Sequence, residues 1–265
     1  MYSSFQLAKK YLNYRLTASN GKGHGVHSPF VFDFIKNVLR DKKQYDCYTK
    51  IEAIRKELLL NKRIIQVEDF GAGSTVIKSN QRMLSDIAAS SLKPKKYAQL
   101  LYRMVQYYQP KTIIELGTSL GVTTSYLASG NTSARVYTCE GAKEIASVAK
   151  RNFDILNFDN IEVVEGDFTK TLPTLFDQLQ QIDFAFVDGN HRKEPTLDYF
   201  TKFLNLSTPS TILVFDDIHW SKEMEEAWTE IQQHPAVTLT IDLFFVGIVC
   251  INTSIKAKQH FSIIY

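Results

Sequence analysis

The sequence has few cysteines and no long hydrophobic run. Three cysteines, Cys47, Cys139 and Cys250, occur in 265 residues, an odd number that does not suit the paired disulfides of a small secreted protein. The longest apolar run, Leu243–Ile251, is too short to cross a bilayer. The N-terminus also lacks the apolar core of a signal peptide. These absences predict a soluble, cytoplasmic protein with no membrane partner.

Neither sign of charge dominates the sequence. The 31 lysines and arginines nearly balance the 28 aspartates and glutamates, giving a net charge of +3, which is too small to indicate nucleic-acid binding by charge alone. With 44% hydrophobic and 22% charged residues, the composition is that of an ordinary globular protein. We therefore expect a folded protein with a small-molecule partner rather than a nucleic acid.

The sequence pattern changes near residue 90. Residues 1–90 show no regular alternation and predict a smaller helical region, with helices at Phe5–Leu16, Pro29–Leu39 and Ile51–Asn61. This region could serve as a lid or as part of a substrate pocket. Residues 91–265 instead alternate short β-branched runs with helical stretches, a pattern typical of βαβ units. They are therefore predicted to form one Rossmann-like domain.

The predicted fold class is α/β, with a doubly wound, mostly parallel sheet that ends in an antiparallel hairpin. The last two strands, Val237–Asp242 and Phe244–Ile251, follow each other too closely for the crossover that a parallel pair needs. The other expected strands are Thr112–Leu116, Val136–Cys139, Ile161–Val164, Phe184–Val187 and Thr211–Phe215. The helices expected in this region are Pro94–Tyr108, Val122–Ala128, Ala142–Leu156, Leu172–Gln180, Pro195–Leu206 and Lys222–Gln233.

Acidic residues lie at the carboxyl ends of the first five strands of this domain, where open α/β sheets bind ligands. The loop after the first strand contains Gly117 and Gly121, which permit a sharp turn and a close approach to a ligand. It lacks the GxGxxG spacing of a dinucleotide site, and Glu115 would repel a phosphate. The loop therefore disfavours a dinucleotide-dependent oxidoreductase and suits a cationic ligand, although the glycines could also serve only the turn.

The segment Ile113–Gly121 resembles motif one of class I S-adenosylmethionine-dependent methyltransferases. Serine in place of the middle glycine, together with the preceding helix Lys96–Tyr108, is similar to the catechol O-methyltransferase branch. The resemblance extends from about Pro94 to the C-terminus. It includes the acids Glu140, Asp167, Asp188, Asp216 and Asp217.

This resemblance implies a cofactor site for S-adenosylmethionine. Glu140 would accept hydrogen bonds from both ribose hydroxyls, and Asp167 would bind the adenine amine. Glu115 would orient the first loop or bind the ammonium group of the cofactor. Asp167 could instead cap the helix that follows it. The full predicted set is Glu115, Gly117, Thr118, Ser119, Glu140, Gly141, Asp167, Phe168 and Asp188.

The turn Asp188–His191 and the pair Asp216 and Asp217 resemble the sugar and macrolide O-methyltransferases, which implies a magnesium ion and a histidine base. Carboxylates at neighbouring strand ends would repel one another unless a cation relieved them. The predicted metal ligands are Asp188, Asp216 and Asp217, and the predicted catalytic residues are His191 and Asp188. In the alternative interpretation, Asp217 caps the helix that begins near Ser221, and His191 makes an ordinary loop hydrogen bond.

The predicted activity is O-methylation of a small hydroxylated molecule or a sugar. The alternatives are an RNA or protein methyltransferase and a cofactor-binding protein without catalysis. Val187–Asn190 stands where base-amine methyltransferases carry an Asn/Asp-Pro-Pro-Tyr motif, which argues against an RNA substrate. The Gly21–Gly25 turn, with His24 and His27, could form a mobile lid. The glycine-rich segment Glu68–Ser74 is interpreted as a turn.

Overall fold

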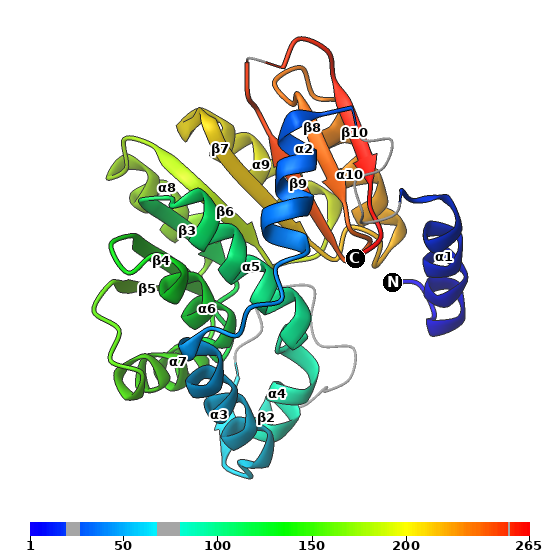
Figure 1. The fold of residues 1–265 in the computed structure, drawn as a ribbon. Helices are drawn as coiled ribbons and strands as arrows, with labels where there is room; N and C mark the ends of the chain where they lie inside the picture. Colours follow the sequence, from blue (N-terminus) through cyan, green and yellow to red (C-terminus); the bar gives the residue numbers. More distant parts are fainter. Residues whose placement is uncertain (20–26, 68–79, 254) are drawn as a thin grey trace. The chain divides into compact units, whose positions relative to one another are not determined.

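The computed structural model describes residues 1–19, 27–67, 80–253 and 255–265 (Figure 1). The chain divides into two units, one made of Met1–Asp41 with Gln181–Tyr265 and the other of Lys42–Gln180. The boundary predicted at residues 90 and 91 falls inside the second unit, and that division stays a prediction. The glycine turn at residues 21–25 and the glycine-rich segment at residues 68–74 lie outside the described residues.

The main sheet has eight strands, is mostly parallel and has the strand order β10-β8-β9-β7-β6-β3-β4-β5. This confirms the predicted fold class. All seven predicted strands are present, with ends that differ by a few residues. Their bounds, with the additional β10, are β3 Thr112–Leu116, β4 Arg135–Glu140, β5 Ile161–Glu165, β6 Ile182–Val187, β7 Ser207–Asp216, β8 Leu239–Asp242, β9 Val246–Cys250 and β10 Gln259–Ser262.

The second unit contains the parallel strands β3, β4 and β5, which lie side by side (Figure 1). Leu116 pairs with Cys139, and Glu140 pairs with Glu165, so the carboxyl ends of the three strands are level. Its helices are α3 Asp46–Leu60, α4 Leu84–Ser91, α5 Lys95–Tyr108, α6 Val122–Gly130, α7 Lys143–Ile155 and α8 Phe168–Asp177.

Helix α3 of the N-terminal region packs into the core of this second unit. The ring of Tyr48 on α3 lies 5.1 Å from that of Tyr102 on α5 and 5.5 Å from that of Tyr126 on α6. The Tyr126 hydroxyl donates to Glu52 of α3 at 2.8 Å, and Arg55 pairs with the same carboxylate. Edge-to-face ring contacts add to the free energy of burying these side chains.

Three short elements of the second unit were not predicted. They are α4 and an antiparallel pair of three-residue strands, β1 Ile64–Gln66 and β2 Gln81–Met83. Three residues are too few for the alternation of apolar and polar residues to be recognised.

The first unit contains the remaining strands. β6 and β7 are parallel, whereas β9 is antiparallel to both β7 and β8, which confirms the predicted C-terminal hairpin. β10 was not predicted and pairs with β8 in parallel. The helices of this unit are α1 Ser4–Thr17, α2 Pro29–Phe34, the π-helix η1 Ile35–Leu39, α9 Lys193–Leu206 and α10 Lys222–Gln233. No helix in the described ranges is long and apolar enough to cross a membrane.

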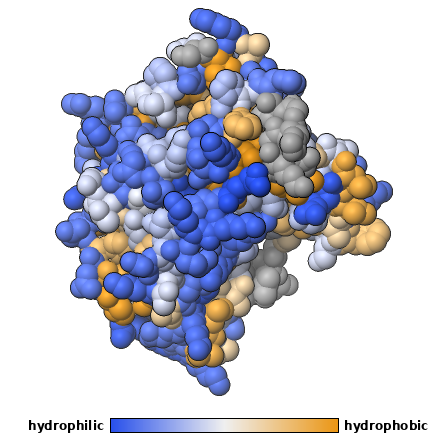
Figure 2. Space-filling model, viewed as in Figure 1, coloured by the Kyte–Doolittle hydropathy of each residue, from blue (hydrophilic) through white to orange (hydrophobic). Residues whose placement is uncertain are grey.

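Helix α1 presents two chemically different faces. The Tyr14 hydroxyl donates to the Ile263 carbonyl, and Lys10 pairs with Glu225 at 2.9 Å, so this face contacts the C-terminal part of the unit. The other face exposes Phe5, Leu12 and Leu16, which Figure 2 shows as an apolar area over α1. Contacts with residues more than 200 positions away therefore fix the place of this helix.

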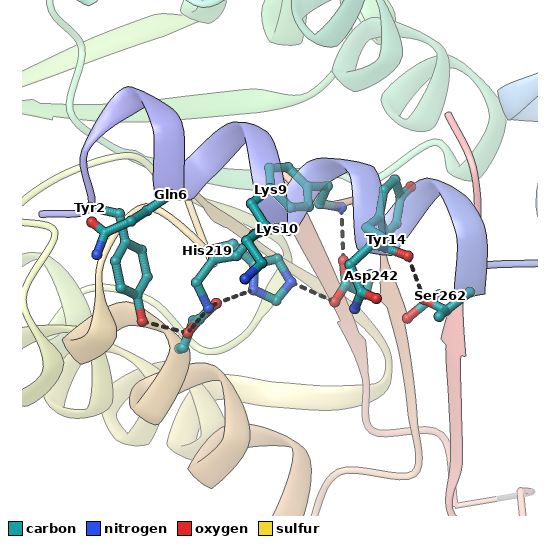
Figure 3. A pocket seen from close by; sticks show the side chains of 12 residues that line it. Tyr2, Gln6, Lys9, Lys10, Tyr14, His219, Asp242 and Ser262 are labelled. Carbon is teal, nitrogen blue, oxygen red and sulfur yellow. Dashed lines mark hydrogen bonds and ion pairs between the residues drawn. The ribbon is translucent and has the colours of Figure 1, made fainter.

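His219 lies at the centre of the polar network beneath α1, in a cavity of about 560 Å³ (Figure 3). Its Nε2 is 2.8 Å from Asp242 Oδ2, and its Nδ1 is 3.1 Å from Glu225 Oε1. Glu225 also accepts hydrogen bonds from the Tyr2 hydroxyl and the Lys10 ammonium group. Burial disfavours the charged imidazole, but the hydrogen bonds and charges of the two carboxylates outweigh burial and raise the pKa of His219.

This raised pKa predicts a pH-dependent stability. The imidazolium is favoured in the folded state, so its contribution is fully present below the unfolded pKa of about 6.5 and is lost as the pH rises through the folded value. The free energy of unfolding of the wild type should therefore exceed that of His219→Gln by the largest margin near pH 6, with the margin shrinking toward pH 9. Urea unfolding of both proteins at several pH values measures this margin.

His27→Gln is a matched control, because His27 is an exposed histidine outside the pocket lining. It should give a pH profile parallel to that of the wild type. A difference in the free energy of unfolding between the wild type and His219→Gln that stays constant or grows with pH would contradict the raised pKa of His219.

Candidate functional site

The first loop of the second unit is folded back onto the end of β4. The backbone amides of Gly117 and Thr118 both donate to the Cys139 carbonyl, at 3.0 and 3.1 Å. Gly117 has a φ of 99°, a backbone conformation that residues other than glycine rarely adopt. At Gly121, where φ is 80°, an added Cβ would lie 2.6 Å from the Phe153 ring. Both glycines are therefore required by the backbone of this loop.

Glu140 links the ends of β3, β4 and β5. Its carboxylate accepts the Ser119 amide on one oxygen and the Ala142 amide on the other, both at 2.9 Å. Its backbone carbonyl accepts the amide of Gly166 at 2.9 Å. The side chain is half-buried, and each carboxylate oxygen can accept more than one hydrogen bond. Gly141 follows directly and leads to α7.

Glu115 is completely buried within the second unit. Its carboxylate accepts hydrogen bonds from the hydroxyls of Thr124 on α6 and Thr138 on β4, the latter at 2.6 Å. The hydroxyls of Thr138 and Thr118 are also 2.6 Å apart. Glu115 thereby joins the first loop to β4 and α6. The two roles suggested for it from the sequence, orienting the first loop or binding the cofactor's ammonium group, stay predictions.

Asp167 is the N-cap of α8, which was the alternative left open by the sequence. Its Oδ1 accepts both the backbone amide and the hydroxyl of Thr169 at 2.9 Å. These hydrogen bonds lower the pKa of Asp167. Phe168 begins the helix. The places of Asp167 and Phe168 in the cofactor site stay predictions.

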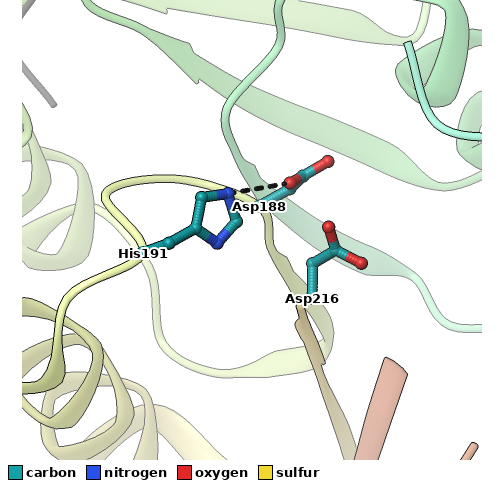
Figure 4. Close-up of side chains that lie close together, drawn as sticks. All are labelled: Asp188, His191 and Asp216. Carbon is teal, nitrogen blue, oxygen red and sulfur yellow. Dashed lines mark ion pairs between the residues drawn. The ribbon is translucent and has the colours of Figure 1, made fainter. Parts of the chain in front are cut away.

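Asp188, His191 and Asp216 converge in the first unit (Figure 4). Val187 pairs with Phe215 in the parallel register of β6 and β7, which places the two acids at the same edge of the sheet. One ligand atom from each of the three residues lies within 4.8 Å of the others. His191 Nε2 is 3.5 Å from Asp188 Oδ1, and the Asp216 carboxylate is 1% exposed.

Two left-handed residues shape the turns at this edge. Asn190 has a φ of 50° and Asp217 a φ of 53°, values that Asn and Asp tolerate better than most residues. Asp217 donates its amide to the Phe245 carbonyl at 2.7 Å and is not one of the three converging residues. The N-cap of α10 is Ser221, which accepts the amide of Met224. The alternative in which Asp217 caps this helix is therefore wrong, and its role as a ligand stays a prediction.

Trp220 lies beside His191 and was not among the residues predicted from the sequence. Its ring centroid lies 5.7 Å from that of His191, with an interplanar angle of 55°. Its place three residues after the acidic pair, in the same loop, was a signal that could have drawn attention to it.

Comparison with known proteins identifies the family of the chain. Residues 114–218 match a protein family that is described as a methyltransferase domain. A catechol O-methyltransferase from Niastella koreensis is 32% identical over 158 residues, which cover 57% of this chain and 69% of that protein. The chain belongs to the class I S-adenosylmethionine-dependent O-methyltransferases. The O-methyltransferase imqG of Aspergillus flavus is 30% identical over 150 residues, covering 54% of this chain and 58% of that relative.

Solved structures show the same fold for this O-methyltransferase. The SAH-bound methyltransferase PaMTH1 of Podospora anserina has a TM-score of 0.59 at 12% identity, covering 95% of this chain and 98% of its own. The O-methyltransferase of Bacillus cereus in complex with SAH has a TM-score of 0.56 at 21% identity, covering 82% and 96%. These likenesses confirm the predicted Rossmann-like architecture.

The buried Glu115 network gives a prediction about stability. Thr138→Val should lower the free energy of unfolding by about 1–3 kcal/mol, because it removes a hydroxyl donor from a buried carboxylate while keeping the side-chain shape. Thr138→Ser keeps the hydroxyl donor and should avoid most of that loss. Denaturant unfolding measures both variants, and equal stability of Thr138→Val and the wild type would contradict the role of the hydrogen bond.

Proposed function

We propose that this O-methyltransferase methylates a hydroxyl group of a small hydroxylated molecule or a sugar, in a reaction assisted by a magnesium ion. The observation that carries the proposal is the convergence of Asp188, His191 and Asp216 within 4.8 Å at the carboxyl edge of β6 and β7. A catechol O-methyltransferase among the relatives supports a small hydroxylated acceptor. The nearly balanced charge of the chain argues against a polyanionic acceptor such as RNA.

The second unit would hold S-adenosylmethionine, which supplies an electrophilic methyl group to the reaction. Glu140, whose carboxylate is oriented by the Ser119 and Ala142 amides, would accept hydrogen bonds from the ribose diol. Because Gly117 has no side chain, the methionine part of the cofactor would be able to lie close to the backbone of residues 117–119. Asp167 and the Phe168 amide remain the proposed contacts of the adenine.

The donors at the edge of the first unit fit a hard divalent cation. A nearly buried carboxylate at Asp216 and a half-buried one at Asp188 repel each other unless a proton or a cation intervenes. Their oxygens favour magnesium or calcium over zinc. When bound, such an ion lowers the pKa of a coordinated hydroxyl group. Asp217 is the remaining proposed ligand.

His191 is the proposed general base. Its side chain is 23% exposed, which lets a substrate proton reach it, and histidine titrates near neutral pH. The Asp188 carboxylate lies 3.5 Å from His191 Nε2 and would favour the imidazolium that forms. The two residues therefore divide the work of accepting and stabilising one proton.

The ribose assignment predicts a loss of cofactor affinity. Glu140→Ala should weaken binding of S-adenosylhomocysteine by several-fold to about a hundredfold, since a hydrogen bond to a charged group contributes about 1.5–3 kcal/mol. Isothermal titration calorimetry measures the dissociation constant. Glu165→Ala is the matched control, because Glu165 ends the neighbouring strand and pairs with Lys150. Equal affinities of Glu140→Ala and the wild type for S-adenosylhomocysteine would contradict the proposed ribose contact of Glu140.

The metal and base assignments predict a specific pattern of activity. With catechol as the first acceptor tested, chelator should abolish methyl transfer and magnesium should restore it. Asp216→Asn should abolish turnover while cofactor affinity survives. His191→Ala should lower the rate by roughly 10²–10⁴ near neutral pH, with partial recovery at higher pH, where the acceptor ionises unaided.

Asp198→Asn is the control for the metal prediction, because Asp198 pairs with Lys202 on the surface of α9. It should leave turnover and metal dependence unchanged. Full activity in chelator would defeat the magnesium proposal and leave His191 as a base that works without metal.

A further inference from the structure

Trp220 is the aromatic neighbour of the proposed base. It lies in the loop between β7, which ends at Asp216, and α10, which begins at Lys222. Its ring is half-buried and lies 5.7 Å from the imidazole of His191, centroid to centroid. Tilted ring pairs at this distance attract each other.

The backbone of Trp220 is fixed from both sides. Its amide donates to the Asp217 carbonyl at 2.9 Å, and its carbonyl accepts the amide of Tyr2 at 3.1 Å. The preceding residue, His219, bonds to two carboxylates, and the following residue, Ser221, caps α10. The indole is therefore attached to a segment that Tyr2, β8 and α10 restrain.

The imidazole of His191 has weaker restraints of its own. The distance of 3.5 Å to Asp188 exceeds that of an ordinary N–H···O hydrogen bond, so this contact alone does not fix the plane of the ring. Its loop turns at the left-handed Asn190 and contains Gly189. A base must point at the proton it abstracts, and small errors in direction reduce the rate strongly.

We propose that Trp220 is a positioning residue, whose indole limits the rotation of His191 and keeps its imidazole directed toward Asp188. The inference rests on the proposed function of His191 as base. It also connects the segment before α1 to the site, because the Tyr2 amide donates a hydrogen bond to the Trp220 carbonyl. The contribution to methyl transfer is indirect, since the indole contacts the base.

The test compares Trp220→Phe, Trp220→Leu and Trp228→Phe with the wild type. Trp228 is the second tryptophan of the chain and is buried against Gly247, so it controls for the loss of an indole elsewhere. Protein labelled with ¹³C at the ε1 carbon of histidine gives one NMR signal per histidine, and His191→Asn identifies the signal of His191. The same variants are assayed for transfer to catechol with magnesium.

Trp220→Leu should shift and broaden the His191 signal. The imidazole would no longer lie in the ring-current field of the indole, and it would sample more orientations. Its kcat should fall by about tenfold to a hundredfold while the KM for S-adenosylmethionine stays within about twofold. Trp220→Phe keeps an aromatic ring and should recover most of the kcat. Trp228→Phe should leave the His191 signal unchanged.

An unchanged His191 signal in Trp220→Leu, or an unchanged kcat, would overturn the proposal. A loss of kcat that Trp220→Phe shares in full would also overturn it, because an aromatic ring would then not suffice. If the wild type methylates neither catechol nor any other small hydroxylated molecule or sugar that is assayed, the proposed function fails. The NMR comparison still decides in that case whether Trp220 restrains the imidazole.

Discussion

The parallel alignment of neighbouring strands is the constraint on which the candidate site depends. In each unit the register makes the carboxyl ends of adjacent strands level, so residues that follow different strands meet at one edge. Pairing of Val187 with Phe215 brings Asp188 and Asp216 together. Pairing of Leu116 with Cys139 places the first loop against Glu140. A shift of either register would separate these groups.

Acidic side chains concentrated at such an edge must be compensated, and the protein does this in different ways. Glu115 is buried and receives two threonine hydroxyls. Glu140 receives two backbone amides, and Asp167 receives an amide and a hydroxyl as a helix cap. At Asp188 and Asp216 two carboxylates and an imidazole share one small space. The proposed cation would compensate this last pair.

The fold and the trio at β6 and β7 could be predicted because local patterns determine them. β-branched runs mark the strands, and a residue that directly follows a strand lies at its carboxyl end. The sequence could not show which of Asp216 and Asp217 faces His191, because the left-handed turn at Asp217 decides this. Nor could it show β10 or the network of Tyr2, Lys10 and Glu225, which depend on contacts between distant parts of the chain.

The most direct measurement of the central claim is anomalous diffraction from crystals grown with manganese and S-adenosylhomocysteine. Manganese replaces magnesium at oxygen-rich sites and gives an anomalous signal that identifies it. The account predicts a peak bounded by the side chains of Asp188 and Asp216, beside His191, and no such peak in crystals of Asp216→Asn. A fully occupied manganese site elsewhere in the protein, with no peak between these two carboxylates, would contradict it.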